Sequence, residues 1–252
     1  MSMDPQLSEL IEKIGLPQRD LAAALPYLGC GCTPNAVSRA KRLAWALDSA
    51  LQVRSRYQSL GIADSVYFDT MRDITVWCGN CRALGLQNTA WLANHMRLEL
   101  FQLGRLQFQM APFQKPHYAA CPSALAPVLH VHIPQGSPLD HDACRRSFQY
   151  ARTFFAAHFP DYAYRAFVCE SWLLFSGNAQ FMQPNSNILK FASLFQLCGD
   201  NTKNPQGYDR IFGLNRPHFA HTTSLQKSAR RYILHGGRLG AGFGYILKED
   251  IV

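Results

Sequence analysis

The chain has 252 residues, 48% of them apolar and 17% charged, which is enough apolar material for one large domain or two modest ones and excludes a disordered chain. The formal net charge is +8, with 10 Lys and Arg against 8 Asp and Glu (+2) in residues 1–97 and 15 against 9 (+6) in residues 98–252. The chain lacks both an apolar run of the roughly 18 residues that span a bilayer and, at its start MSMDPQLSELIEK, the apolar stretch of a secretory signal. We therefore expect a cytoplasmic protein with no membrane partner, whose eight cysteines are reduced thiols.

The first part of the chain is predicted to form a helical domain over residues 1–97. Asp or Thr followed directly by Pro is typical of a helix start, and Gly15 and Gly61 are typical of helix ends. Between Thr33-Pro34 and Gly61, apolar residues recur with a period of 3.6, as on the buried face of a helix. The expected helices begin at Asp4-Pro5, at Thr33-Pro34, at Asp64 and near Asn88.

From residue 98 onward the pattern changes to strands that alternate with helices, which we assign to a second domain, residues 98–252. LELFQLGRLQFQM alternates apolar and polar residues and predicts a strand around Leu106 and Phe108. Ser137-Pro138-Leu139-Asp140 has the pattern of a capping box with proline at the first helical position, and predicts a helix start. Further expected elements are strands at 128–133, 164–175, 208–214 and 239–247 and helices at 187–197 and 223–237.

The stretch VLHVHIPQGSPLD, residues 128–140, combines a buried strand with two histidines. On a strand, His130 and His132 share one face. A strand that ends in a loop before a capped helix directs backbone N–H groups at one point, which is suited to an anion such as a diphosphate. An ordinary strand-to-helix turn has the same appearance. The residues predicted to bind such a ligand are Ile133, Gln135, Gly136, Ser137, Leu139 and Asp140.

Several segments resemble a known protein family. FQLGRLQFQ, HVHIPQGSPLDHDACRRSFQYARTFF, CESWLL, NSNILKF and TSLQKSARRYILHGGRLGAGFGYIL are similar to the GNAT-like C-terminal domain of bacterial N-acyltransferases, and DITVWCGNCRALGLQNTAWLANH is similar to the end of the helical domain that precedes it. The resemblance implies an α+β fold, with a helical N-terminal domain followed by a mixed β-sheet flanked by helices. It also implies an acyl-CoA co-substrate lying where two neighbouring strands part, and an amine acceptor that is a small molecule or a peptide.

The loop that follows the strand with His130 and His132 departs from the diphosphate-loop pattern of the family. The usual acetyltransferase diphosphate loop has Gln or Arg, two residues, Gly, one residue, and then Gly or Ala. Here Gln135 begins such a motif, but the glycines are missing and Pro138 lacks an N–H donor. A GNAT-like protein that binds an acyl ligand without catalysis is therefore kept as an alternative.

Acyl transfer to an amine requires a base that removes a proton from the attacking ammonium. Glu170 is a candidate because a carboxylate among the apolar residues of FVCESWLL would have a raised pKa. His130 and His132 are further candidates, since histidine titrates near neutral pH. Cys169 and Ser171 are weaker candidates for a nucleophile, with no base identifiable beside them.

Three other patterns each have a structural explanation beside a functional one. Lys227, Arg230, Arg231 and Arg238 would suit CoA phosphates or a solvated helix face. Cys30 and Cys32 are too close together for the usual zinc knuckle, and Cys78 and Cys81 fall inside a helical pattern, so no metal is expected. The glycines of GAGFG, residues 240–244, are better explained by bulges or close strand packing than by a dinucleotide loop.

Residues 16–44 faintly resemble a helix-turn-helix, with RDLAAAL as first helix and NAVSRAKRL as recognition helix, which keeps a DNA-binding regulator as a second alternative. The charge of only +2 in residues 1–97 argues against it, so we expect no nucleic-acid partner. The oligomeric state is left open.

Overall fold

The computed structural model describes residues 3–80, 83–113, 125–213 and 223–251, and it confirms the α+β class. The chain divides into two compact units. The first comprises Met1–Met110, Ile133–Ser137 and Phe154–Pro160, and the second comprises Ala111–His132, Pro138–Thr153 and Asp161–Val252. The domain boundary predicted after residue 97 stays a prediction. No helix in the described ranges has the length and apolarity required to cross a membrane.

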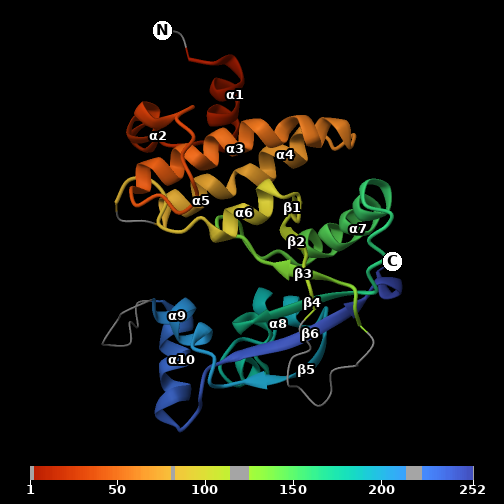
Figure 1. The fold of residues 1–252 in the computed structure, drawn as a ribbon. Coiled ribbons are helices and arrows are strands. Elements are labelled where there is room, and N and C mark those ends of the chain that lie inside the picture. The colour runs from red at the N-terminus through yellow and green to blue at the C-terminus, as the bar shows by residue number, and fades with distance from the viewer. Residues whose placement is uncertain (1–2, 81–82, 114–124, 214–222, 252) are drawn as a thin grey trace. The chain divides into compact units, whose positions relative to one another are not determined.

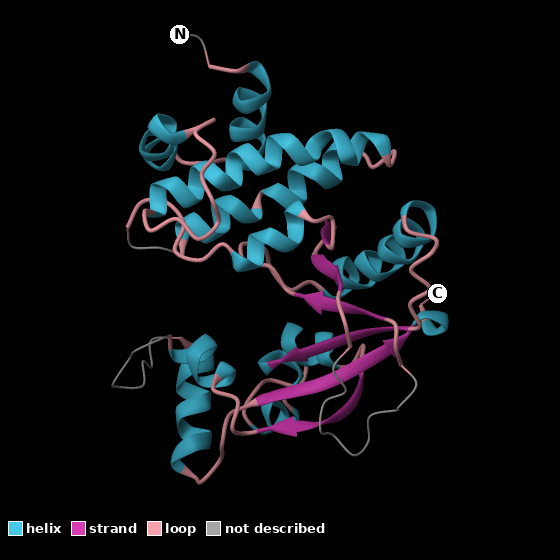
Figure 2. Cartoon of the chain, in the orientation of Figure 1, coloured by secondary structure: helices cyan, strands magenta, loops and turns pink. Residues whose placement is uncertain are grey.

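The first unit is mostly helical and carries one β-hairpin (Figure 2). Its elements are α1 (Pro5–Ile14), α2 (Gln18–Ala24), the 3-10 helix η1 (Leu25–Tyr27), α3 (Arg39–Ser59), α4 (Asp64–Met71), α5 (Asp73–Gly79), α6 (Ala90–Met96), β1 (Leu100–Leu103) and β2 (Leu106–Met110). The predicted start of the first helix is confirmed, because the Asp4 side chain accepts hydrogen bonds from the N–H groups of Gln6 and Leu7. Gly15 ends that helix with a left-handed φ of 65°.

One predicted helix start in this unit is wrong, whereas the start at Asp64 is confirmed. The long helix α3 begins at Arg39 rather than behind Pro34, and residues 28–38 are irregular. The guanidinium of Arg42 donates to the carbonyls of Ala36 and Val37, which stabilises this loop in place of a helical turn. The predicted recognition helix from Asn35 therefore lacks its first turn, and the helix-turn-helix interpretation fails on geometry. Asp64 is the first residue of α4 and not its cap.

Aromatic rings from distant parts of the sequence form the core of the first unit. Tyr57 of α3 packs edge-on against Tyr67 and Phe101, with ring centroids 5.3 and 5.7 Å apart. Phe101 of β1 also lies 5.0 Å from Phe154 and 5.2 Å from Phe159. Such pairs add about 0.5–1.5 kcal/mol each to the burial of their area. Residues 154–160 are therefore part of this core although the sequence places them far from it.

The second unit is a mixed sheet with helices. Its elements are β3 (Val128–His132), α7 (His141–His158, of which the last five residues belong to the first unit), β4 (Ala166–Ser171), η2 (Trp172–Leu174), η3 (Ser176–Gln180), α8 (Asn187–Ala192), β5 (Gln196–Asn201), α9 (Gln206–Phe212), α10 (Ser224–Leu234), β6 (Ala241–Leu247) and η4 (Lys248–Asp250). Strands β3 and β4 are parallel, and β6 pairs antiparallel with β4 on one side and with β5 on the other (Figure 1).

Three predictions in this unit are wrong. Residues 208–212 belong to helix α9 instead of a strand, and Leu214 lies outside the described residues. The helix expected over 187–197 ends at Ala192, and a strand that was not expected, β5, begins at Gln196. Helix α7 begins at His141, so the capping box predicted from Ser137 does not form. The carboxylate of Asp140 instead caps the helix, accepting from the Ala143 N–H at 2.7 Å.

The glycines of β6 allow another backbone to lie directly on the strand, as the sequence predicted. A Cβ atom placed on Gly242 would lie 2.2 Å from the carbonyl oxygen of Leu174 in η2. One placed on Gly240 would lie 2.5 Å from the carbonyl oxygen of Asn201. The chain that leaves β4 can therefore turn across β6 in direct backbone contact.

We expect Gly242→Ala to destabilise the protein by about 1–3 kcal/mol, because the new methyl group meets backbone that cannot move aside easily. Gly79→Ala is the matched control, since a Cβ there has no atom within 4 Å and Gly79 ends helix α5. Alanine in a helix is favoured over glycine, so the control should be neutral or slightly stabilising. Melting temperatures of both variants test this, and equal shifts would contradict it.

Candidate active site

Strands β3 and β4 part before either strand ends. Their parallel ladder pairs Val128 with Ala166, Leu129 with Phe167 and His130 with Val168. Beyond that point β3 runs on to His132 and β4 to Ser171, while β4 stays paired with β6 up to Ser171 and Gly242. The carboxyl ends of two parallel neighbours therefore diverge, and such a point, called the gap below, is the usual place for a ligand in an open sheet. This arrangement agrees with the parting strands that the resemblance implied.

The three candidate bases lie on one face of the sheet at this gap. Side chains alternate along a strand, so His130 and His132 share the face of Val128. In the ladder His130 stands opposite Val168, and Glu170 follows on the same face of β4. The apolar part of this face is a buried cluster of Leu125, Val128, Ala166, Val168, Cys198 and Phe243. The register therefore places the three candidate bases on one face of two neighbouring strands.

The environment of His130 favours a neutral imidazole. The ring is largely buried, and burial lowers its pKa below 6.5, opposed only in part by a hydrogen bond with the backbone of Pro112. Within the described chain its Nε2 atom is buried and has no hydrogen-bond partner. A neutral imidazole at pH 7 is able to accept a proton, as a general base must.

Glu170 does not have the surroundings that motivated its prediction. Its side chain is exposed rather than held among apolar residues, and its Oε1 accepts a 3.3 Å hydrogen bond from the amide of Asn204. Its role as a base stays a prediction, without the support of burial. His132 is partly buried at the end of β3.

The two candidate nucleophiles beside Glu170 point to the other face and are buried. Burial raises the pKa of the Cys169 thiol to about 12, with a smaller contribution from Glu170, so almost none of it is thiolate at neutral pH. The hydroxyl oxygen of Ser171 accepts from the Leu173 N–H at 3.2 Å and caps η2. Both residues therefore have structural explanations.

The predicted diphosphate loop divides between the two units. Ile133, Gln135, Gly136 and Ser137 belong to the first, and Leu139 and Asp140 to the second. Gln135, Gly136 and Ser137 are exposed, and Ile133 and Leu139 are partly buried. Because the Asp140 carboxylate already occupies the N-terminus of α7, an anion there would meet a negative charge. Exposed backbone N–H groups of residues 135–137 are the better donors.

The basic cluster is exposed, and the described cysteines of the two pairs differ in exposure. Lys227, Arg230 and Arg231 are exposed on α10, and Arg238 is exposed after it. Cys30 is exposed, Cys32 is partly buried and Cys78 is buried, whereas Cys81 lies outside the described residues. Where side chains are described, no three His, Cys, Asp or Glu residues are placed to hold a metal ion.

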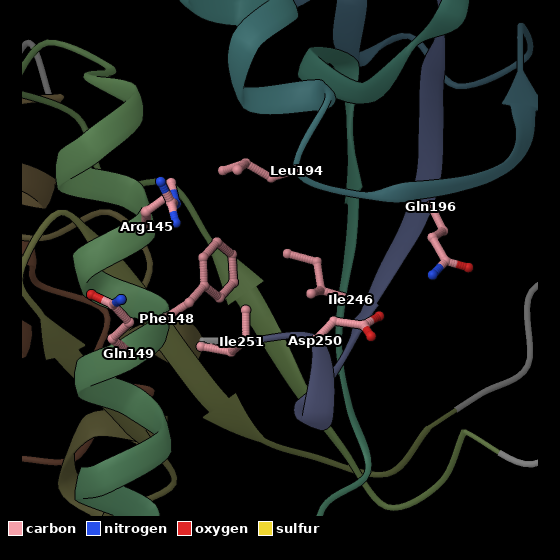
Figure 3. A pocket seen from close by; sticks show the side chains of 8 residues that line it. All are labelled: Arg145, Phe148, Gln149, Leu194, Gln196, Ile246, Asp250 and Ile251. Carbon is pink, nitrogen blue, oxygen red and sulfur yellow. The ribbon is translucent and has the colours of Figure 1, made fainter.

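A hollow of about 180 Å³ lies on the opposite side of the sheet from the candidate bases. Phe148 of α7 and Ile246 of β6 face each other in it, with Arg145, Gln149 and Asp250 around them (Figure 3). Ile246 pairs with Phe167, which alternates away from Val168 and Glu170. This hollow is below the roughly 300 Å³ of a typical ligand pocket, and none of the three candidate bases lines it.

We expect the imidazole of His130 to titrate below pH 6.5, because burial disfavours its charged form. A series of ¹H–¹³C NMR spectra between pH 4.5 and 8 measures this, with His130→Gln used to assign the signal. A midpoint at or above 6.5 would contradict the expectation. Protonation of this histidine favours the unfolded chain. The contribution of His130 to the free energy of unfolding is therefore present above pH 6.5 and declines as the pH falls through that value.

Comparison with known proteins agrees with this geometry. Residues 26–98 match the model of the N-acyltransferase N-terminal domain, and residues 100–246 match that of the GNAT-like C-terminal domain. None of the curated proteins matches the chain. A crystal structure described as an acyltransferase in complex with decanoyl-CoA and teicoplanin superposes with a TM-score of 0.78 at 19% identity, covering 98% of this chain and 89% of that one.

A second structure, an acyltransferase in complex with CoA and 10C-teicoplanin, gives a TM-score of 0.78 at 19% identity, with 97% and 88% of the two chains covered. At this identity the superposition shows a shared fold. The family models together span nearly the whole chain, and the GNAT-like model alone spans more than half of it. The chain therefore belongs to the N-acyltransferases that join an N-acyltransferase N-terminal domain to a GNAT-like C-terminal domain.

Proposed function

We propose that the protein transfers an acyl group from acyl-CoA to an amine on a small molecule or a peptide. The observation that carries the proposal is the early end of the β3–β4 ladder at His130 and Val168, beside three titratable side chains on one face. The fold is shared with acyltransferases that were crystallised with CoA and decanoyl-CoA, one of them also with teicoplanin. A cytoplasmic location, as expected from the sequence, would give access to acyl-CoA.

The backbone at the gap supports binding of an extended thioester arm. Val131 and His132 on β3 and Cys169 to Ser171 on β4 lie beyond the last pair of the shared ladder. An extended ligand that lies along parted strands pairs with strand backbone as an added strand does, and the amide groups of a pantetheine arm suit such pairing. We place the thioester at these strands. The loop of residues 133–140 stays the predicted diphosphate site.

We propose His130 as the general base, ahead of Glu170 and His132. It removes a proton from the acceptor ammonium, directly or through water. The amine nitrogen then attacks the thioester carbonyl carbon, a C–N bond forms as the C–S bond breaks, and the CoA thiolate leaves and takes up a proton. Neutral His130 at the end of the ladder is ready to accept a proton at pH 7, whereas exposed Glu170 is held by Asn204.

Three matched variants distinguish the candidate bases: His130→Gln, His132→Gln and Glu170→Gln. Loss of a positioned base typically lowers the rate 10²–10⁴-fold, so we expect about that loss in kcat for His130→Gln with CoA affinity nearly unchanged. The acid limb of the pH–rate profile should disappear in the same variant. If Glu170→Gln or His132→Gln shows this behaviour and His130→Gln keeps full activity, the assignment to His130 is wrong.

Isothermal titration with CoA, acetyl-CoA and decanoyl-CoA tests the binding step. We expect saturable binding, and a ligand at 100 times its Kd should add about 2.7 kcal/mol to stability. No binding of any of the three at millimolar concentration would contradict the proposed function. Tight binding without transfer to a panel of amines would favour the alternative, a GNAT-like protein that binds an acyl ligand without catalysis.

A further inference from the structure

The turn of the first unit's hairpin reaches the loop after β3. Leu103 and Leu106 are the last ladder pair of β1 and β2, so Gly104 and Arg105 form the turn between them. From this turn the guanidinium of Arg105 donates from Nη1 to the carbonyl oxygen of Pro134 at 3.0 Å and from Nη2 to that of Ser137 at 2.9 Å. One side chain therefore holds both ends of the four-residue loop 134–137, and all of these residues belong to the first unit.

The two hydrogen bonds fix the direction of backbone donors in the loop. In a trans peptide the C=O of one residue and the N–H of the next point in opposite directions. Because the Pro134 carbonyl points at Arg105, the N–H of Gln135 points away from it. Ser137 is followed by a proline, which has no N–H to present. Gly136 lies between them with a left-handed φ of 99°, which glycine adopts without strain.

Arg105 also lines a hollow of about 190 Å³ beneath this loop. The hollow is bordered by Gln135 and Ser137 on one side and by Asp69, Arg72 and Asp73 of the helices on the other. The Asp73 carboxylate is buried and accepts from the indole of Trp91 at 2.7 Å and lies 3.0 Å from Nε2 of His95. The surroundings of Arg105 are therefore fixed by helix packing, which suits a residue that sets the shape of an exposed loop.

We infer that Arg105 is a positioning residue, which holds loop 134–137 in the shape that presents its outward N–H groups to the diphosphate of acyl-CoA. The inference rests on the proposed function. It explains how a loop without the usual glycine spacing can still form a diphosphate site: the shape comes from a side chain about 30 residues earlier in the chain instead of from glycines within the loop. Arg105 need not touch the ligand.

Arg105→Lys tests the inference, because lysine keeps the charge but cannot reach two carbonyls with a planar fork. Arg97→Lys is the matched control, since Arg97 also uses its side chain in hydrogen bonds, to Glu99 and Asn94, but away from the loop. We expect Arg105→Lys to raise KM for acyl-CoA about tenfold with kcat within about twofold of wild type. The control should match wild type in both constants.

A second readout separates loop shape from general stability. Pantetheine keeps the thiol arm of CoA but lacks the diphosphate and adenosine, so we compare the affinities of CoA and pantetheine by isothermal titration. Wild type and Arg97→Lys should prefer CoA, and Arg105→Lys should lose about tenfold of that preference while its affinity for pantetheine stays unchanged. Gly136→Ala, which is strained at its φ of 99° but has open space around its Cβ, should lose the same preference.

The outcomes are distinguishable. Wild type that binds neither CoA nor pantetheine contradicts the proposed function itself. Wild type that binds both equally, or an Arg105→Lys protein that keeps the preference for CoA, overturns the role of Arg105 while the transferase proposal stands. A parallel loss of affinity for both ligands, or a protein that no longer folds, also overturns it, because Arg105 would then stabilise the fold as a whole.

Discussion

The early end of the β3–β4 ladder determines where the candidate site lies. Each strand continues after the last pair, His130 with Val168, and β4 keeps its pairing with β6 on the other side. The carboxyl ends of neighbouring parallel strands are the usual place for a ligand in an open sheet. His130 lies in the last pair of this ladder, and its ring is largely buried.

The contact of η2 with β6 explains how β4 can end where it does. After Ser171 the chain turns across β6, with the Leu174 carbonyl so close to Gly242 that no side chain would fit. Backbone packed on backbone lets the chain change direction within the three residues of η2. A strand with ordinary side chains at this position would push the crossing chain outward. Gly242 of β6 therefore influences where β4 ends, and through this the shape of the gap, although it does not line the gap.

Local sequence patterns predicted the strands of the candidate site, but they could not predict contacts between segments that are far apart in the chain. The alternation of VLHVHI correctly placed His130 and His132 on one face, because a period of two is set by the strand itself. The start of α7 was predicted three residues early since Ser137 and Asp140 both have capping side chains, and only packing decides which is used. Strand β5, QLCGDN, has few apolar residues and a register shift at Gly199, so it gives no strand pattern. Arg105 contacts residues about 30 positions later in the chain, and a local periodic pattern gives no information about such a contact.

The aromatic core of the first unit bears on how such chains can be dissected or recombined. Tyr57 packs on Phe101, and Phe101 packs on Phe154 and Phe159. A fragment that stops at residue 97 would keep Tyr57 and lose its neighbour Phe101, together with Phe154 and Phe159 that pack on Phe101, exposing a large apolar surface. Exchange of N-terminal halves between family members at that point would leave mismatched rings on both sides of the junction. A chimera with a sound core would have to carry the hairpin and the last turn of α7 together with the helices, although they are far apart in the gene.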